Sequence, residues 1–204
     1  MQFDRAKLSA LILYACTKCE SANLGAVKLH KVLYFSDMLH FAESGSPITG
    51  STYRKRPFGP TCDQLLSTLS HLTEAKALRI EEVEYFGYKK KQFVSLTEPD
   101  TAKLNSEELA LINEVIDFVC VENSAKTISE FSHNRAWELA EFGESLPYTS
   151  VFQIFPTQVS LDAIEWARGE ADQIADQRSK ADPLGYASFA DFRSRVLETR
   201  RLSQ

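Results

Sequence analysis

The sequence predicts a mainly α-helical α+β fold: a compact helical domain with one small β-hairpin and further helices at the carboxyl end. Three observations lead to this prediction. Apolar residues recur at helical spacing in most segments, two β-like runs flank a single G-Y-K-K connection, and glycines and prolines stand mostly between the segments. The 204 residues, 44% hydrophobic and 25% charged, supply enough apolar material for one core.

Residues 3–19 and 25–43 are predicted to form the first two helices. In the first helix, apolar residues recur at helical spacing: Phe3, Ala6, Leu8, Leu11, Ile12 and Ala15. In the second, one face carries Leu29, Val32, Leu33, Ser36 and Leu39. Asn23 and Gly25 separate the two helices, and the second is expected to end before Gly45.

The stretch from Ile48 to Arg56, I-T-G-S-T-Y-R-K-R, is rich in β-branched and aromatic residues and is predicted to be extended. A third helix is expected to begin after Pro60, because proline suits a first helical turn, and to run to about Ala75. Its inward face is expected to hold four leucines: Leu65, Leu66, Leu69 and Leu72.

Two β-like runs come next, L-R-I-E-E-V-E-Y-F and K-Q-F-V-S-L-T. They predict a hairpin over about residues 78–96, with Gly87 available for a positive φ in the turn. A helix followed by a hairpin is the pattern of the carboxyl half of a winged-helix domain. The fold prediction therefore includes a winged-helix-like element.

The last part of the chain contains two patterns typical of helix starts. Asn105 with Glu108 predicts a capping box for a helix over about 106–121, and Thr127 with Glu130 predicts another before I-S-E-F-S-H. Residues 145–160 are read as a loop with one strand-like piece, V-F-Q-I-F, and two charge-rich helices are expected after it. The chain is accordingly divided into a domain over residues 1–155 and a helical C-terminal extension over residues 156–204.

The sequence contains no pattern typical of a catalytic, metal or cofactor site. It has no glycine-rich phosphate loop and no G-x-S-x-G elbow, and its four histidines are scattered. Cys16 and Cys19 lack the second close pair of ligands that a structural zinc site needs, so they are read as two reduced thiols. We therefore expect no catalytic residue, metal or cofactor. No apolar run is long enough for a membrane span, and the expected location is the cytoplasm.

Three lysines at the hairpin tip, Lys89, Lys90 and Lys91, favour an alternative function. They suit the wing of a winged-helix DNA-binding regulator, although the formal net charge of −5 argues against non-specific nucleic-acid binding by the whole chain. Lysines at a turn also prevent edge-to-edge association of strands, which is a structural explanation for the same residues.

The segment from Lys28 to Pro60 contains two motifs with characteristic spacing. The first, K-L-x-K-x-L-Y-x-x-D, is formed by Lys28, Leu29, Lys31, Leu33, Tyr34 and Asp37. The second is a small polar turn and an extended segment that ends in Phe-Gly-Pro, formed by Gly45, Pro47, Ile48, Tyr53, Phe58, Gly59 and Pro60. A later element contains Ile128, Ser129, Ser132, His133 and Trp137. With these motifs, residues 5–145 resemble the Panacea domain of SocA-like bacterial and phage antitoxins.

The resemblance implies a non-catalytic antitoxin that neutralises a cognate toxin encoded beside it, in some relatives with a protease or chaperone as a further partner. Phe58 stands where the family often has tyrosine. The partner-binding residues that we predict are Lys31, Tyr34, Asp37, Tyr53, Phe58, Gly59 and Pro60. For Tyr34, Asp37 and the Phe-Gly-Pro corner, the alternative is a scaffold role that fixes the second helix to the extended segment. DNA remains the alternative partner, no membrane is expected, and the oligomeric state is left open.

Overall fold

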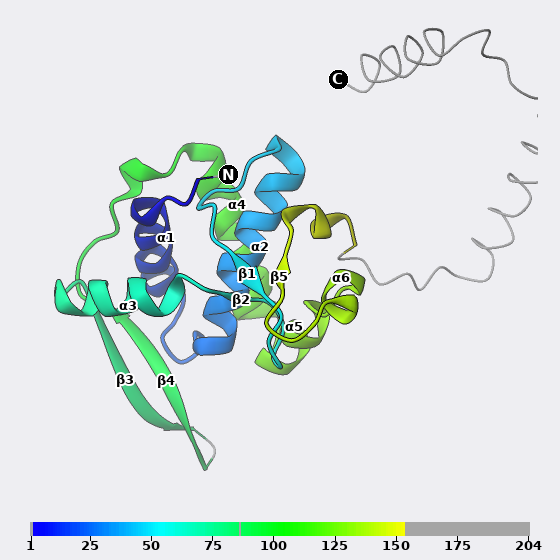
Figure 1. Ribbon diagram of the computed structural model, residues 1–204. Helices are drawn as coiled ribbons and strands as arrows, with labels where there is room; N and C mark the ends of the chain where they lie inside the picture. Colours follow the sequence, from blue (N-terminus) through cyan, green and yellow to red (C-terminus); the bar gives the residue numbers. More distant parts are fainter. Residues whose placement is uncertain (1, 86, 154–204) are drawn as a thin grey trace, which may run out of the picture. The chain divides into compact units, whose positions relative to one another are not determined.

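The computed structural model describes residues 2–85 and 87–153 (Figure 1). The predicted extension over 156–204 lies outside these residues, as does the predicted domain boundary at residue 155. In the described part, the prediction of a mainly helical α+β fold is confirmed. No helix of this part combines the length and the apolar character that crossing a bilayer requires.

The helical elements in chain order are α1 (Arg5–Lys18), α2 (Ala26–Ser44), α3 (Leu65–Glu74), the 3₁₀ turn η1 (Thr101–Lys103), α4 (Ser106–Ile116), the π-helical η2 (Asp117–Glu122), α5 (Ala125–Phe131), α6 (Arg135–Leu139) and the 3₁₀ helix η3 (Tyr148–Gln153). The strands are β1 (Tyr53–Arg54), β2 (Thr61–Cys62), β3 (Leu78–Tyr85), β4 (Tyr88–Ser95) and β5 (Ser145–Leu146). They form two antiparallel sheets, one with the order β2-β1-β5 and one that is the β3-β4 hairpin.

Helix α2 runs through the middle of the helical body and contacts α1, α4, α5, η2, η3 and β2 (Figure 1). Its predicted apolar face is in the core, but residues outside that face, such as Tyr34 and Phe35, are buried as well. Neighbouring elements cover the middle of α2 on all sides, so apolar residues there occur around the whole circumference of the helix. Gly45 ends α2 in the left-handed conformation, with φ of 77°.

The polypeptide around Pro60 differs from the prediction. Thr61 and Cys62 form strand β2, with Cys62 opposite Tyr53, so α3 begins only at Leu65. The backbone of this stretch finds its hydrogen-bond partners in the sheet instead of in a first helical turn. Leu66 was expected to face inward but is 72% exposed, because α3 packs through Leu65, Leu69 and Leu72.

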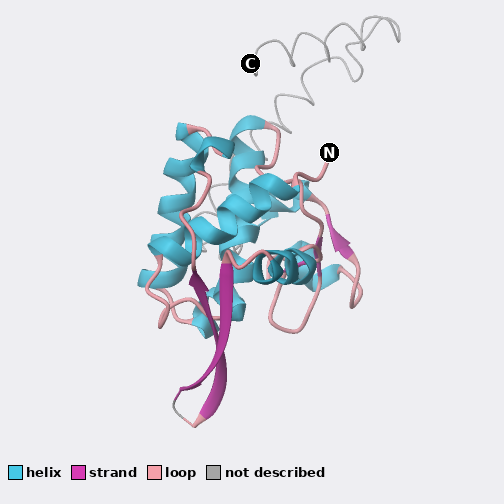
Figure 2. Ribbon diagram, turned by 90° about the vertical axis from the view of Figure 1, so that its left-hand side faces the viewer, coloured by secondary structure: helices cyan, strands magenta, loops and turns pink. Residues whose placement is uncertain are grey.

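The predicted hairpin is confirmed. Strands β3 and β4 pair from Leu78 opposite Ser95 to Tyr85 opposite Tyr88, and Gly87 in the turn has φ of 81°. The base of the hairpin contacts α3 and α1, and its tip projects away from the helices (Figure 2).

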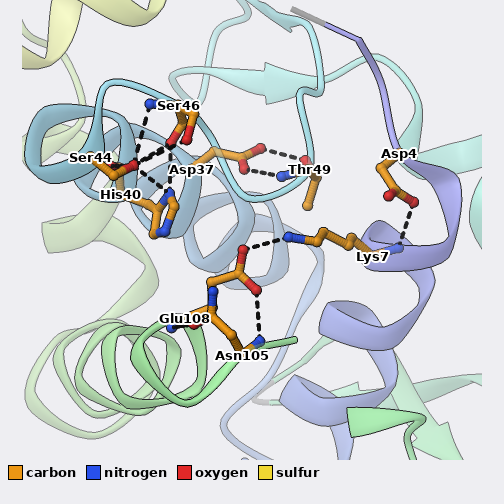
Figure 3. Close-up of polar contacts among 9 residues, drawn as sticks. All are labelled: Asp4, Lys7, Asp37, His40, Ser44, Ser46, Thr49, Asn105 and Glu108. Atoms are coloured by element: carbon orange, nitrogen blue, oxygen red, sulfur yellow. Dashed lines mark hydrogen bonds and ion pairs between the residues drawn. The ribbon is translucent and has the colours of Figure 1, made fainter. Parts of the chain in front are cut away.

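The first predicted capping box is also confirmed. The Asn105 side chain accepts from the Glu108 backbone N–H at 2.8 Å, and Glu108 accepts from the Asn105 N–H at 2.9 Å. Glu108 is buried, and its other carboxylate oxygen is 2.5 Å from Lys7 Nζ of α1 (Figure 3). The same glutamate therefore starts α4 and fixes it to α1.

Two local predictions in the last described segment are wrong. Ser124, not Thr127, caps α5, because the Ser124 hydroxyl accepts from the Thr127 N–H at 3.0 Å. Val151 and Phe152 of the V-F-Q-I-F run belong to the 3₁₀ helix η3 instead of a strand. The strand in this segment is the two-residue β5, which comes before η3 and pairs with β1 in the sheet.

Candidate functional site

Asp37, in the second half of α2, lies at the centre of a buried polar cluster. Its Oδ1 accepts from the Thr49 backbone N–H at 2.6 Å and its Oδ2 from the Thr49 hydroxyl at 2.5 Å (Figure 3). The hydroxyls of Tyr53 and Tyr148 reach Oδ2 at 2.8 and 3.4 Å. The cluster joins α2 to the following loop, to β1 and to η3.

Burial raises the pKa of the Asp37 carboxyl above its ordinary value, and the hydrogen bonds from Thr49, Tyr53 and Tyr148 lower that pKa in part. Burial also raises the pKa of Tyr53. Asp37, Thr49 and Tyr53 are buried and Tyr148 is half-buried, and all four form hydrogen bonds within the fold. The cluster therefore orders the backbone where α2, β1 and η3 meet.

Tyr34 lies one turn before Asp37 and is fully buried. Its ring packs edge-on against Phe35 and Tyr53, with centroids 5.2 and 5.3 Å away. Its hydroxyl accepts from Asn134 Nδ2 at 3.2 Å, and burial raises its pKa to about 12. Because Asn134 is also the N-cap of α6, Tyr34 links the central helix to that later segment.

The residues from Arg56 to Pro60 form a tight turn, which we call the corner. The Gly59 N–H donates to the Arg56 carbonyl at 3.0 Å, and Ser129 Oγ of α5 donates to the Phe58 carbonyl at 2.9 Å. Gly59 has φ of 90°, and a Cβ there would collide with Lys31 Nζ and Ser132 Oγ. Glycine is thus required twice, for its conformation and for the space that it leaves.

Lys31 reaches the corner from α2. Its Nζ donates to the Pro60 carbonyl at 3.0 Å, and the residue is only 1% exposed. Burial lowers the pKa of Lys31 from 10.5 to about 7. The corner is therefore held by α2 on one side and by α5 on the other.

The structure separates the predicted partner-binding residues into two groups. Lys31, Tyr34, Asp37, Tyr53, Gly59 and Pro60 are buried. Phe58 differs from them, since its side chain is 69% exposed at the tip of the corner. The buried positions fit the scaffold alternative in this conformation, and Phe58 has the exposure that contact with a partner requires.

The hairpin lysines lie beside the first turn of α2, apart from the Asp37 cluster. Lys89 pairs with Glu82 at 3.0 Å, Lys90 Nζ donates to the Ala22 carbonyl, and Lys91 is exposed. DNA binding by these lysines stays a prediction.

Several residues of the site were not singled out from the sequence. Thr49 and Tyr148 complete the Asp37 cluster, and Asn134 bonds Tyr34. Tyr148 and Asn134 are about a hundred positions from their partners, so helical period and spacing give no signal for them. Among residues 2–85 and 87–153, no group of three or more His, Cys, Asp or Glu side chains is placed to hold a metal ion.

Comparison with known proteins assigns the chain to a family. Residues 29–138, more than half of the chain, match the family model described as "Antitoxin SocA-like, Panacea domain". This range includes α2 from Leu29 onward, the corner, the hairpin, α5 and α6 as far as Glu138. No curated protein and no solved structure matches the chain.

Proposed function

This chain belongs to the family of SocA-like antitoxins with a Panacea domain, and we propose that it neutralises a cognate toxin by binding it directly. One observation carries the binding part of the proposal: Phe58 is 69% exposed on a corner whose backbone is fixed from both sides. An exposed aromatic ring on ordered backbone loses little conformational entropy when it is covered, so it is a favourable anchor for a protein partner.

We further propose that neutralisation requires no catalytic step by this chain. Asp37 and Lys31, whose pKa values burial displaces, have the properties that catalytic groups often share. Both, however, are buried and bonded to residues of the same fold, which supports a structural role for them.

The proposed site of action is the cytoplasm. Cys16, Cys19, Cys62 and Cys120 are all free thiols, and cysteines in this state are usual in a reducing compartment.

The proposal is tested by expressing the reading frame beside this gene, alone and together with this chain. We expect growth arrest by the neighbour alone, rescue by co-expression, and purification of the two proteins as a complex. A harmless neighbour, or a toxic neighbour that this chain does not neutralise, would refute the proposal. The half-life of the toxin during rescue then distinguishes sequestration, which preserves the toxin, from delivery to a protease, which shortens its half-life.

A further inference from the structure

Three adjoining hollows surround the first turn of α2, with volumes of about 650, 360 and 200 Å³. Ala26 borders all three of them. The largest lies between the hairpin and the start of α5, the second between α3 and the hairpin, and the smallest reaches Phe58 at the corner. We call the three together the α2 groove.

Cations concentrate along this groove. The largest hollow is lined by Lys28, Lys89, Lys90, Lys91 and Lys126. The smallest is lined by Arg56 and by Lys31, whose pKa burial lowers to about 7. Within the part of the chain that the structure describes, no Asp or Glu lines any of the three hollows. The chain as a whole has a formal net charge of −5, so the groove differs in sign from the average surface.

Hydrogen bonds and ion pairs hold several of these lysines in place. Lys28 is buried and donates to the Cys120 carbonyl at 3.0 Å, and Lys90 donates to the Ala22 carbonyl. Lys89 and Lys126 have glutamate neighbours at 3.0 and 3.9 Å, but these pairs are solvent-exposed and contribute little. The charges of Lys89 and Lys126 are thus only weakly neutralised by their glutamate partners.

Exposed apolar side chains lie in the same groove. Leu66 and Ile80 border the second hollow and are 72% and 37% exposed, and Phe58 borders the third. Covering these side chains removes apolar surface from water, which favours an occupant that brings apolar groups of its own.

We propose that the α2 groove receives a segment of the toxin in which Asp or Glu residues stand next to apolar side chains. The acidic groups complement the lysines of the largest hollow, and the apolar side chains fill the two hollows beside Leu66 and Phe58. Leucine, isoleucine and phenylalanine offer no hydrogen bonds to base edges or phosphates, so the groove fits such a peptide better than a DNA duplex. This inference rests on the proposed function and specifies the surface that performs it.

The test replaces two exposed groove lysines, Lys91→Gln with Lys126→Gln, and measures the affinity for the purified toxin at low and high salt. We expect affinity to fall about tenfold at low salt, and the salt dependence to weaken, because both lysines contribute long-range attraction. The matched control is Lys76→Gln with Lys103→Gln, which removes the same charge from two exposed lysines that line none of the three hollows. This control should bind as the unchanged protein does.

Overlapping peptides that span the toxin sequence identify the occupant. We expect the peptides that bind to combine acidic and apolar residues and to lose binding to the Lys91→Gln, Lys126→Gln protein. If the unchanged protein neutralises the toxin but both double variants bind it equally well, the groove inference is wrong while the proposed function stands. If the groove variant instead loses binding to a mixed-sequence DNA duplex and keeps the toxin, the groove is a nucleic-acid surface and the inference is overturned.

Discussion

The two halves of helix α2 differ in what surrounds their charged side chains. In the second half, Asp37 is enclosed, and its oxygens are bonded to Thr49 and approached by two tyrosine hydroxyls of the same chain. At the first turn, lysines from α2, the hairpin and α5 border open hollows that no acidic side chain of the described residues lines. In the enclosed half, Asp37 has its hydrogen-bond partners within the chain. The first turn, in contrast, gains interactions when a partner supplies acidic and apolar groups. One helix thus stabilises the fold at one end and presents a surface at the other.

The largest effect is expected for Tyr34→Ala, one turn before Asp37 in the enclosed part of α2. Removing a buried aromatic ring that packs against Phe35 and Tyr53 should lower the free energy of unfolding by about 3–5 kcal/mol. Urea unfolding measures this loss. Tyr34→Phe is the control, since it keeps the ring and removes only the hydroxyl that accepts from Asn134. If the Tyr34→Ala protein is as stable as the unchanged protein but no longer binds the toxin, Tyr34 belongs to the interface. The contrast between an enclosed part and a binding part of α2 would then be wrong.

Asp37→Ala is expected to have the next largest effect. The Thr49 backbone N–H would lose its buried acceptor, and the tyrosine hydroxyls would lose a partner, at a cost of about 3 kcal/mol in the free energy of unfolding. The matched control is Asp63→Ala. Asp63 forms an ion pair with Arg54 in which both side chains are partly exposed, so its loss should cost below about 1 kcal/mol. Equal costs for the two variants would show that the Asp37 cluster is not a source of stability.

The sequence was sufficient to predict the elements whose structure depends on local residue patterns. The spacing of apolar residues located α1 and α2, and the G-Y-K-K connection located the hairpin turn, because helix period and turn chemistry are set by neighbouring residues. The start of α3 was misplaced because Thr61 and Cys62 pair with β1 across an intervening turn. Tyr34 and Asp37 were identified as important positions, but their burial depends on Tyr148 and Asn134, which only the folded chain brings near them.

At the surface end, Phe58→Ala should change binding and leave stability alone. Loss of an exposed aromatic anchor is expected to weaken toxin binding by about 2 kcal/mol. Because the ring is 69% exposed, the free energy of unfolding should change by less than about 0.5 kcal/mol. Calorimetric titration of the toxin and a thermal melt measure the two quantities. Phe152→Ala is the control, since Phe152 has the same exposure and borders none of the three hollows. Identical binding by the Phe58 and Phe152 variants would remove the corner from the interface.

The smallest effect concerns Lys31, which lies on α2 between the first turn and Asp37. Burial lowers its pKa from 10.5 to about 7, so above about pH 7 the folded chain releases a proton that the unfolded chain keeps until about pH 10.5. Stability from this residue therefore rises with pH across that window and is constant below it. The ionisable neighbours His30 and His133 have pKa values lowered by burial, so both are neutral in the window.

The prediction compares the unchanged protein with Lys31→Met, which keeps a long unbranched side chain and removes the titrating group. Between about pH 7 and pH 8 the free energy of unfolding of the unchanged protein should rise by about 1 kcal/mol relative to the variant, since one pH unit is worth at most about 1.4 kcal/mol per proton. Urea unfolding of both proteins at the two pH values gives this difference directly. If the difference between the two proteins is the same at both pH values, Lys31 remains charged against the Pro60 carbonyl. The corner would then resemble the charged first turn of α2 and not its enclosed half.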